Sequence, residues 1–329
     1  MKQRVLVSIL NWNGTEDTVA CTKSLIDSLI PNELSVTIRI VDNGSNEEQR
    51  AVLEKESQRF PDFVDVFYSN KNTGFAGGQN INIRFAQDNH FDYVWLLNND
   101  TVVPHGALEH LVTTIQREPQ AGAISPVIVR MGNKNIVDFC GAVHDWDLID
   151  TIRCPDLKSA PEFCQTYKDS LWAMGTALLL KTEAVNDVGL LNEKLFAYYE
   201  DDDYGTRLIN KNWRTLIDLD VHVEHACFDG DMYKRQPYFF YLMNRNALLL
   251  AIEHTPSKYR KFLKLKFADR AASMARKLKA KGENEKANAC ILGYVDGLVG
   301  NYGAPVLDRP LPLWAKALIP LSTIWNAFK

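Results

Sequence analysis

The chain has 329 residues, of which 46% are hydrophobic and 24% charged, and its formal net charge is −4. This length and apolar content suffice for one large core with an appendage and exclude an intrinsically disordered protein. The six cysteines include no C-x-x-C pair, which argues against a disulfide framework or zinc ribbon and favours a reduced, cytoplasmic setting.

The net charge conceals a division of the chain. Residues 231–329 carry 17 Lys and Arg against 7 Asp and Glu, whereas residues 1–230 carry 20 against 34. We therefore predict two regions with different partners, a first domain over 1–230 and a C-terminal region over 231–329, whose pattern is helical. The densest basic stretch, Lys258–Lys281, suits an anionic membrane surface or nucleic acid, and the alternative is a solvated helix face. Only six apolar or small residues follow Arg4 before Asn11, too few for a signal-peptide core.

The first hundred residues alternate between strand and helix patterns. Strands are predicted at Val5–Leu10, Val36–Val41 and Val64–Tyr68, with helices from Thr15 and Asn46 between them. A glycine-rich loop, Asn70–Asn80, then leads into a helix over Ile81–Ala86. This βαβαβ order predicts a mostly parallel sheet with right-handed crossovers.

The apolar run Tyr93–Leu97 is typical of a strand buried on both faces, and it stops in Asn98, Asn99 and Asp100. In open α/β sheets, ligands bind where the strands end, so Asp100 is placed to hold a cation or polar substrate. The alternative is that these three residues merely form a turn. Asp42 ends an earlier strand and could accept hydrogen bonds from a base or ribose, with an Asx-turn as its alternative.

The second half adds acids and histidines. Gly175 interrupts a strand-like run, which is typical of close backbone approach by a ligand. Four consecutive acids, Glu200–Asp203, are costly to pack together, and one could serve as a general base. Beyond a strand over Trp213–Leu219, His222 and His225 could coordinate a divalent cation, although lone histidines are more often structural.

In this order, the motifs resemble those of the inverting glycosyltransferases of family 2, which have the GT-A fold. The matching stretches lie between residue 5 and about residue 250 and include Asp42-Asn-Gly-Ser45, Asn72-Thr-Gly-Phe-Ala-Gly-Gly-Gln-Asn80, Asn98-Asn-Asp100, Gly-Leu-Leu-Asn-Glu-Lys-Leu-Phe196, Glu200–Asp203, His225 and Arg245-Asn246. The chain is most similar to the subgroup of rhamnosyl and related transferases of bacterial surface polysaccharides.

The resemblance implies a role for each matching residue. Asp201 would be the catalytic base, while Asp100 and His225 would hold Mg²⁺ or Mn²⁺, with His222 as the fallback ligand. Nucleotide-sugar contacts would come from Asn11, Asn13, Asp42, Gly74, Gly78, Asn80, Asn98 and Asn99. Contacts to the acceptor or sugar would come from Trp172, Gly175, Glu200 and Asp203. The family's Asp-x-Asp motif is Asn98-Asn-Asp100 here, so a single carboxylate remains.

The implied reaction moves a sugar from a UDP- or dTDP-sugar to a hydroxyl of a glycan or polyprenyl-diphosphate-linked acceptor. Asp201 would take the proton of the attacking hydroxyl. No Gln-x-x-Arg-Trp motif follows the acids, so we expect single additions rather than processive synthesis. The expected setting is the cytoplasm, with contact to the inner face of the membrane. The sequence leaves open which sugar and nucleotide are used, and whether the protein forms a homodimer.

The C-terminal region carries an apolar stripe interleaved with the basic run, namely Tyr259, Leu263, Phe267, Ala271, Met274 and Leu278. This pattern predicts an interfacial helix, with packing against the catalytic domain or a second subunit as the equal alternative. Leu311–Phe328 is mostly apolar, but Pro312, Lys316 and Pro320 argue against a membrane-spanning helix.

Three rival functions remain at this level. A sugar nucleotidylyltransferase normally opens with an Arg-containing glycine-rich loop, which Asn11-Trp-Asn-Gly14 does not resemble. A catalytically idle nucleotide- or glycan-binding module is compatible with the incomplete metal motif. Nucleic-acid binding by the basic stretch lacks any accompanying recognition motif, so we expect no nucleic-acid partner.

Overall fold

A computed structural model describes residues 2–31, 33–61, 63–146, 150–226, 232–256 and 260–316. The chain forms two compact units. Unit 1 comprises Met1–His144, Thr151–Glu193 and Glu200–Cys227, and unit 2 comprises Asp145–Asp150, Lys194–Tyr199 and Phe228–Lys329. Unit 2 thus contains two short segments that precede residue 200 in the chain, in addition to the C-terminal region.

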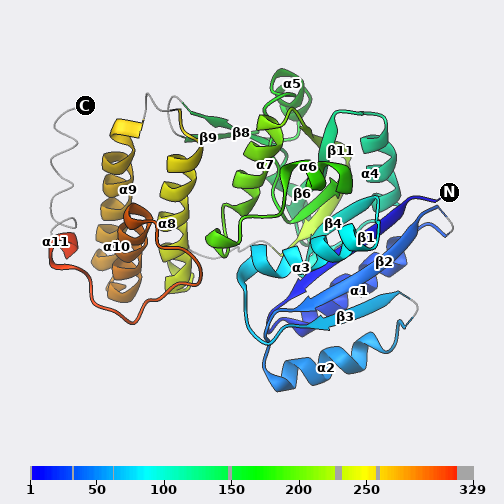
Figure 1. The fold of residues 1–329 in the computed structure, drawn as a ribbon, viewed down its shortest axis with the longest axis horizontal. Helices are drawn as coiled ribbons and strands as arrows, with labels where there is room; N and C mark the ends of the chain where they lie inside the picture. The colour runs from blue at the N-terminus through cyan, green and yellow to red at the C-terminus, as the bar shows by residue number, and fades with distance from the viewer. Residues whose placement is uncertain are drawn as a thin grey trace. The chain divides into compact units, whose positions relative to one another are not determined.

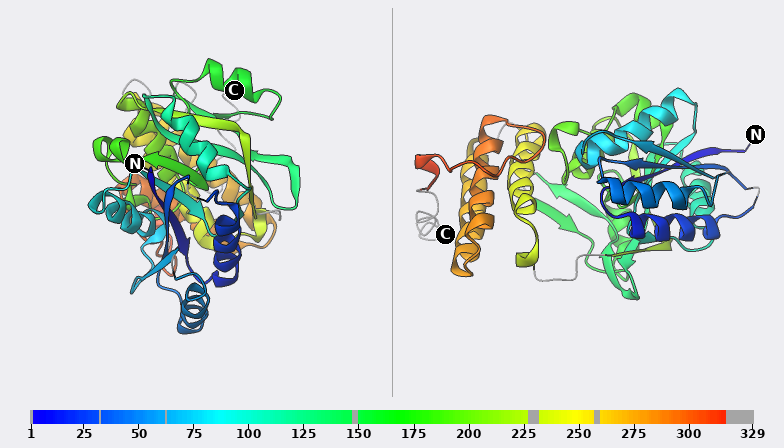
Figure 2. Two further views of the ribbon diagram at one scale, coloured as in Figure 1. Left: turned by 90° about the vertical axis from the view of Figure 1, so that its right-hand side faces the viewer. Right: turned by 90° about the horizontal axis from the view of Figure 1, so that it is seen from below.

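Unit 1 is built on one large sheet with helices on both faces. Its elements, some of which extend a residue or two beyond the unit, are β1 (Arg4–Asn11), α1 (Thr15–Ser28), β2 (Ser35–Asp42), α2 (Glu47–Ser57), β3 (Val64–Tyr68), α3 (Gly74–Asp88), β4 (Tyr93–Asn98), β5 (Thr101–Val102), α4 (Ala107–Gln116), β6 (Ala121–Arg130), β7 (Asn133–Phe139), β8 (Ala142–Asp145), β9 (Asp150–Arg153), α5 (Ala160–Thr166), β10 (Ala177–Lys181), α6 (Thr182–Val188), α7 (Glu200–Asn210) and β11 (Arg214–His225). In the right-hand view of Figure 2, α1 and α2 lie on one side of the blue strands and α3 lies on the other.

The strand order is β3-β2-β1-β4-β10-β6-β11-β5, and β7 pairs with β6 (Figure 1). The half formed by β3, β2, β1 and β4 is parallel, as the sequence predicts. The other half is mixed, because β10 runs antiparallel to both β4 and β6. Ala177, the first residue of β10, lies opposite Leu97 near the end of β4. The chain therefore enters β10 at the edge where the parallel strands end.

β4 is the buried centre that its composition predicts. Val94, Trp95, Leu96 and Leu97 have no solvent-exposed surface, and Tyr93 is 5% exposed. These side chains lie in a core shared with β1, β2, β6 and β10. Because apolar burial is the main favourable term in folding, β4 anchors the sheet and fixes where Asn98 emerges.

Two boundaries differ from the sequence prediction. The expected loop before Ile81 is already helical, since α3 begins at Gly74. Here glycine permits close packing: a Cβ atom on Gly78 would lie 2.3 Å from Leu10 Cδ1. The strand expected to end at Leu219 continues as β11 to His225, with an irregularity between Asp218 and His222.

Unit 2 is helical, as its pattern predicts. It contains α8 (Pro237–His254), α9 (Arg260–Ala280), α10 (Asn284–Val299) and the short α11 (Leu313–Lys316). Figures 1 and 2 show α8, α9 and α10 packed side by side. Of the residues described, no helix is long and apolar enough to cross a membrane. Most of the apolar stretch predicted over Leu311–Phe328 lies outside the described residues.

The prediction of an interfacial stripe on α9 is wrong for the residues described. Leu263, Phe267, Ala271 and Leu278 are at most 6% exposed and belong to the core of unit 2, so packing between helices wins over membrane contact. Tyr259 lies outside the described residues. The apolar side chains that α9 does expose are Phe262 and Leu265, at 57% and 56%.

A close contact between α8 and α10 gives a direct test of this packing. A Cβ atom on Gly293 of α10 would lie 2.2 Å from the backbone oxygen of Tyr241 on α8. We expect Gly293→Ala to destabilise the protein by about 1–3 kcal/mol, because the backbone of α8 must move away. Urea unfolding measures this change. Asn288→Ala, at an exposed position of the same helix, is the control, and equal stability of the two variants would contradict the packing.

Candidate active site

The polar residues that follow β1, β2 and β4 meet at one edge of the sheet. Asn11 lies opposite Asp42, and Leu10 lies opposite Asn98, in the parallel register of the three strands. His225 ends β11, which runs parallel to β6, and Gly175 lies just before β10, which enters at this edge. Strand order and direction therefore gather most of the predicted site residues of unit 1.

Asn11 is a structural centre of this edge. Its amide nitrogen donates to Asp42 Oδ1 (3.0 Å) and to Ser45 Oγ (3.3 Å). Its amide oxygen accepts from Gly14 N (3.3 Å) and Thr18 Oγ1 (2.9 Å). The side chain is fully buried. Asn11 thus connects β1 to the loop after β2 and to the start of α1, so it holds these segments of the edge together.

Asp42 is also enclosed. Its Oδ2 accepts from Arg50 Nε (2.8 Å) and from Ser45 N (3.2 Å), and its side chain has no exposed surface. Arg50 also donates to the backbone oxygen of Ser69. In this conformation a base could contact the carboxylate only after its neighbours move. The predicted base contact stays a prediction, and Arg50 is a partner that the sequence did not indicate.

The loops after β2 and β3 are held together by Asn43, which the sequence analysis did not single out. Its Oδ1 accepts from Thr73 N (3.0 Å), and its Nδ2 donates to Asn72 Oδ1 (3.1 Å) and Gly74 O (2.9 Å). Gly44 has φ +81°, and a Cβ atom there would lie 2.6 Å from the backbone of Lys71. The predicted nucleotide loop is therefore a rigid pair of segments, with Gly74 and Gly78 lying in the first turns of α3.

Asp100 and His225 lie together because the end of β11 pairs with β5. His225 lies opposite Thr101, and Ala226 N donates to Asp100 O (2.9 Å). Asp100 Oδ1 is 3.3 Å from His225 Nε2, and Asn98 Nδ2 is 3.5 Å from the same nitrogen. His222 lies at the irregular part of β11, where its Nε2 is 3.1 Å from Leu219 O. Of the two histidines, His225 is the one beside Asp100.

A second carboxylate flanks His225. Asp138 Oδ2, on β7, is 3.7 Å from His225 Nδ1. Burial alone would lower the pKa of His225, but hydrogen bonds and charge from Asp100 and Asp138 outweigh it and raise the pKa to about 9. No sequence pattern indicates Asp138, because only the pairing of β6 with both β7 and β11 brings it near His225.

These donors fit a divalent cation. A carboxylate and an imidazole nitrogen lie side by side, and both side chains keep a partly exposed surface, 29% for Asp100 and 14% for His225. Asp138 lies at the other ring nitrogen, in the position from which a carboxylate orients a metal-binding imidazole. A cation would take the place of the proton on Nε2. With two protein ligands, the other coordination positions are left to ligand oxygens.

The four acids at the start of α7 have different environments. Asp201 is partly exposed, and its carboxylate accepts from Gly175 N (3.0 Å) and Asp202 N (3.0 Å). Asp203 is buried and paired with Arg207 at 2.8 Å. Burial, together with the charge of Asp201, raises the pKa of Glu200 and of Asp202 well above their ordinary values. Asp201 alone of the four combines fixed geometry with access.

Two predicted ligand contacts have structural roles here. Trp172 is 2% exposed and stacks on His144, with the ring centroids 5.5 Å apart, so it supports the site from the core. Asn80 is fully buried, and its amide bonds to both backbone groups of Leu191 and to Glu193 Oε1. Neither side chain offers surface to a ligand in this conformation, because core packing and the 191–193 segment occupy it.

The remaining predicted residues line the loops. Asn99 Nδ2 donates to Gly14 O (3.2 Å) and Thr18 Oγ1 (3.0 Å), which fixes the loop after β1. Asn13 has a left-handed backbone (φ 53°), and its Oδ1 accepts from Asn46 N (3.0 Å). The adjacent Trp12 is 51% exposed. Asn13 and Trp12 therefore form the rim of the edge, whereas Asn11 and Asn99 lie beneath it.

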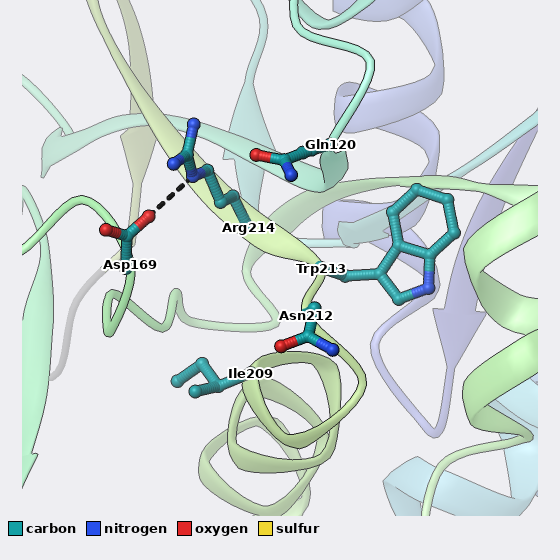
Figure 3. A pocket seen from close by; sticks show the side chains of 6 residues that line it. All are labelled: Gln120, Asp169, Ile209, Asn212, Trp213 and Arg214. Carbon is teal, nitrogen blue, oxygen red and sulfur yellow. Dashed lines mark hydrogen bonds and ion pairs between the residues drawn. The ribbon is translucent and has the colours of Figure 1, made fainter.

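Unit 1 also contains a second possible cation cluster and a polar pocket. His110, Asp218 and Asp220 could hold a cation, with His110 Nε2 3.1 Å from Asp218 Oδ2. A polar pocket of about 180 Å³ is lined by Gln120, Asp169, Ile209, Asn212, Trp213 and Arg214 (Figure 3). This pocket lies where β6 and β11 begin, opposite the edge at which parallel strands bind ligands, and an Asp169–Arg214 ion pair (2.6 Å) crosses it.

The sequence is similar to those of known glycosyltransferases. Residues 7–141 match the family model described as Glycosyl transferase family 2. N-acetylglucosaminyl-diphospho-decaprenol L-rhamnosyltransferase of Mycobacterium tuberculosis is 26% identical over 223 residues, which span 60% of this chain and 68% of the relative. Low-salt glycan biosynthesis hexosyltransferase Agl10 of Haloferax volcanii is 26% identical over 174 residues, which span 53% of each chain.

Solved structures agree in fold. Mannosyltransferase PcManGT from Pyrobaculum calidifontis, in complex with GDP-Man and Mn²⁺, has a TM-score of 0.56 at 14% identity, covering 100% of this chain and 82% of that one. The crystal structure of GalNAc-T7 with UDP, GalNAc and Mn²⁺ has a TM-score of 0.64 at 18% identity, covering 83% and 52%. The match to the family model described as Glycosyl transferase family 2 thus covers residues 7–141, within a chain that has the GT-A fold.

Proposed function

We propose that this glycosyltransferase moves a sugar, with inversion, from a UDP- or dTDP-sugar to a hydroxyl of a polyprenyl-diphosphate-linked glycan. The observation that carries the proposal is the carboxylate of Asp201, which is partly exposed and fixed by Gly175 N and Asp202 N. The acceptor class is supported by the relative from Mycobacterium tuberculosis, whose name specifies a diphospho-decaprenol acceptor. The setting is surface-polysaccharide synthesis.

The proposed mechanism assigns one task to each group. The two N–H donors hold the carboxylate of Asp201 in one orientation, from which it can accept a proton from the acceptor hydroxyl during attack. Attack from the side opposite the leaving group inverts the anomeric carbon. Asp100 and His225 would hold Mg²⁺ or Mn²⁺ against the diphosphate. A bound cation there offsets the negative charge of the departing nucleoside diphosphate.

The other three acids of the cluster support the assignment of Asp201 as the base. Glu200 and Asp202 are buried with raised pKa values, so they resist carrying charge, and Asp203 is neutralised by Arg207. A base must be reachable by the acceptor, and in the Glu200–Asp203 cluster only Asp201 is partly exposed. The contacts of Glu200 and Asp203 with acceptor or sugar stay predictions, since both side chains are at most 7% exposed.

Anionic lipid is the proposed surface on which the acceptor is met. Between Phe262 and Ala280, the exposed residues of α9 are two large apolar ones, five cations and one alanine, with no acid among them. They are Phe262, Lys264, Leu265, Lys266, Arg270, Lys277, Lys279 and Ala280. Apolar side chains flanked by lysines suit the boundary between lipid headgroups and acyl chains. This face differs from the stripe considered in the sequence analysis, whose described residues are mostly buried.

The base is tested first. We expect Asp201→Asn to lower sugar transfer by about 100- to 10,000-fold, because the amide cannot accept the proton, while leaving donor binding intact. Donor binding is measured as the increase in thermal stability that UDP-, dTDP-, GDP- and CDP-sugars produce in the presence of Mn²⁺. Asp169→Asn, at an exposed ion pair, is the matched control. Near wild-type turnover of Asp201→Asn removes Asp201 from this role, and a wild type that no nucleotide stabilises favours an idle binding module.

The cation site is tested by comparing two clusters. We expect Asp100→Asn and His225→Gln each to abolish the Mn²⁺-dependent part of donor stabilisation, because the two side chains are the proposed protein ligands. Asp220→Asn alters the competing cluster with His110 and Asp218 and should leave that stabilisation unchanged. Isothermal titration with Mn²⁺, with and without nucleoside diphosphate, measures both. Loss of cation binding only in Asp220→Asn places the cation at the other cluster.

The lipid surface is tested by vesicle sedimentation. We expect the protein to bind vesicles rich in anionic lipid at low salt and to be released at high salt, since the Debye length shortens. Phe262→Ser with Leu265→Ser should weaken partitioning about tenfold or more, as two large side chains no longer leave water. Val299→Ser, at another exposed apolar residue of unit 2, should have little effect. A protein that ignores anionic vesicles at low salt refutes this surface.

A further inference from the structure

The residues just before the acid cluster have an unusual backbone. Phe196, Tyr198 and Tyr199 have φ angles of 68°, 68° and 70°, in the left-handed region. Large aromatic residues rarely adopt this conformation, because Cβ then crowds the backbone. Such a conformation persists only where surrounding groups determine it. The Lys194–Tyr199 segment, which belongs to unit 2, must therefore be held by specific contacts.

One side chain on α8 supplies most of these contacts. Asn246 Nδ2 donates to the backbone oxygens of Leu195 (2.9 Å), Ala197 (2.8 Å) and Tyr198 (2.9 Å), so its two N–H groups serve three carbonyls. Asn246 is fully buried. Its own oxygen accepts from Arg245 Nε (2.8 Å), which fixes the direction of the amide.

Arg245 strengthens the same attachment. Its Nη2 donates to Leu195 O (2.8 Å) and its Nη1 to Gly303 O (2.6 Å), and the side chain is fully buried. Burial lowers the pKa of Arg245, which reflects the cost of enclosing a guanidinium. The hydrogen bonds to these two carbonyls and the nearby charge of Asp296 offset that cost, and the same bonds attach Leu195 to α8.

Aromatic side chains of the segment are docked as well. Tyr198 packs edge-on against Phe239 of α8, with the ring centroids 5.4 Å apart. Tyr199 Oη accepts from Arg270 Nη2 of α9 (3.2 Å). Both the backbone and the side chains of the segment are thus attached to the helices of unit 2.

We propose that Asn246, oriented by Arg245, is a positioning residue for Asp201. This inference rests on the proposed role of Asp201 as base. The chain passes from Tyr199 directly into α7, whose first two residues are Glu200 and Asp201. Because Tyr199 is bonded directly to Glu200, the backbone conformation held at Tyr198 and Tyr199 acts on the first turn of α7 through the chain itself. Without the amide of Asn246, the segment relaxes to commoner angles and the first turn of α7 shifts.

Asn244 provides a matched control. It lies on the same helix and is 7% exposed, but its Nδ2 donates to Phe240 O (2.7 Å) within α8 itself. Asn246→Ala and Asn244→Ala therefore delete the same atoms from similar depth in unit 2. Only the first deletion touches the Lys194–Tyr199 segment.

Two measurements on the full chain test the proposal. Hydrogen exchange should show that Asn246→Ala loses protection of the amides over 195–203, whereas Asn244→Ala keeps it. In sugar transfer, Asn246→Ala should lower kcat about 10- to 100-fold, since small displacements of a reacting group have effects of this size, with KM for the donor sugar within about twofold. Asn244→Ala should keep both constants close to wild type.

A second variant keeps the test decisive if Asn246→Ala folds poorly. Glycine adopts the left-handed region without steric cost, so Tyr198→Gly in the Asn246→Ala background should restore part of kcat, whereas Tyr198→Ala should not. A well-folded Asn246→Ala with wild-type kcat, or an equal loss of kcat in Asn244→Ala, overturns the proposal. A wild type without transfer activity refutes the proposed function instead, and the exchange pattern then still decides whether Asn246 holds the segment.

Discussion

Backbone pairing between the end of β11 and β5 is the interaction on which the proposed cation site depends. It places His225 opposite Thr101 and the following amide on Asp100 O. A carboxylate and an imidazole that are far apart in sequence are thereby held 3.3 Å apart, and β7 adds Asp138 on the far side of the ring. Side-chain contacts at this edge are consequences of strand order, since a slip of one residue would turn His225 to the other face.

Many polar side chains at this edge hold its loops together. Asn11, Asn43, Asn80 and Asn99 direct their amides to backbone groups and to one another's loops. A short amide can satisfy both a donor and an acceptor, so it suits places where loops are buried and their backbone groups need partners. Residues matched to a ligand role in the family pattern can therefore act by shaping the site.

The four acids at the start of α7 all carry carboxyl groups, but their surroundings differ. Glu200 and Asp202 are buried, Asp203 is paired with Arg207, and Asp201 keeps an accessible carboxylate held by two backbone amides. The helix follows a segment that is attached to α8 through Asn246. The proposed base itself accepts from the backbone N–H of Gly175, within unit 1.

By itself, the sequence determined the alternating first half, the buried strand at 93–98 and the resemblance to a family, because hydrophobic periodicity and motif order are local and survive in any context. Only the tertiary structure decided which of the predicted site residues keep an exposed surface. Trp172 and Asn80 are buried, Asp138 joins His225, and the apolar stripe of α9 lies in the helical core. These outcomes depend on strand direction, register and helix packing between distant segments, which no local pattern encodes.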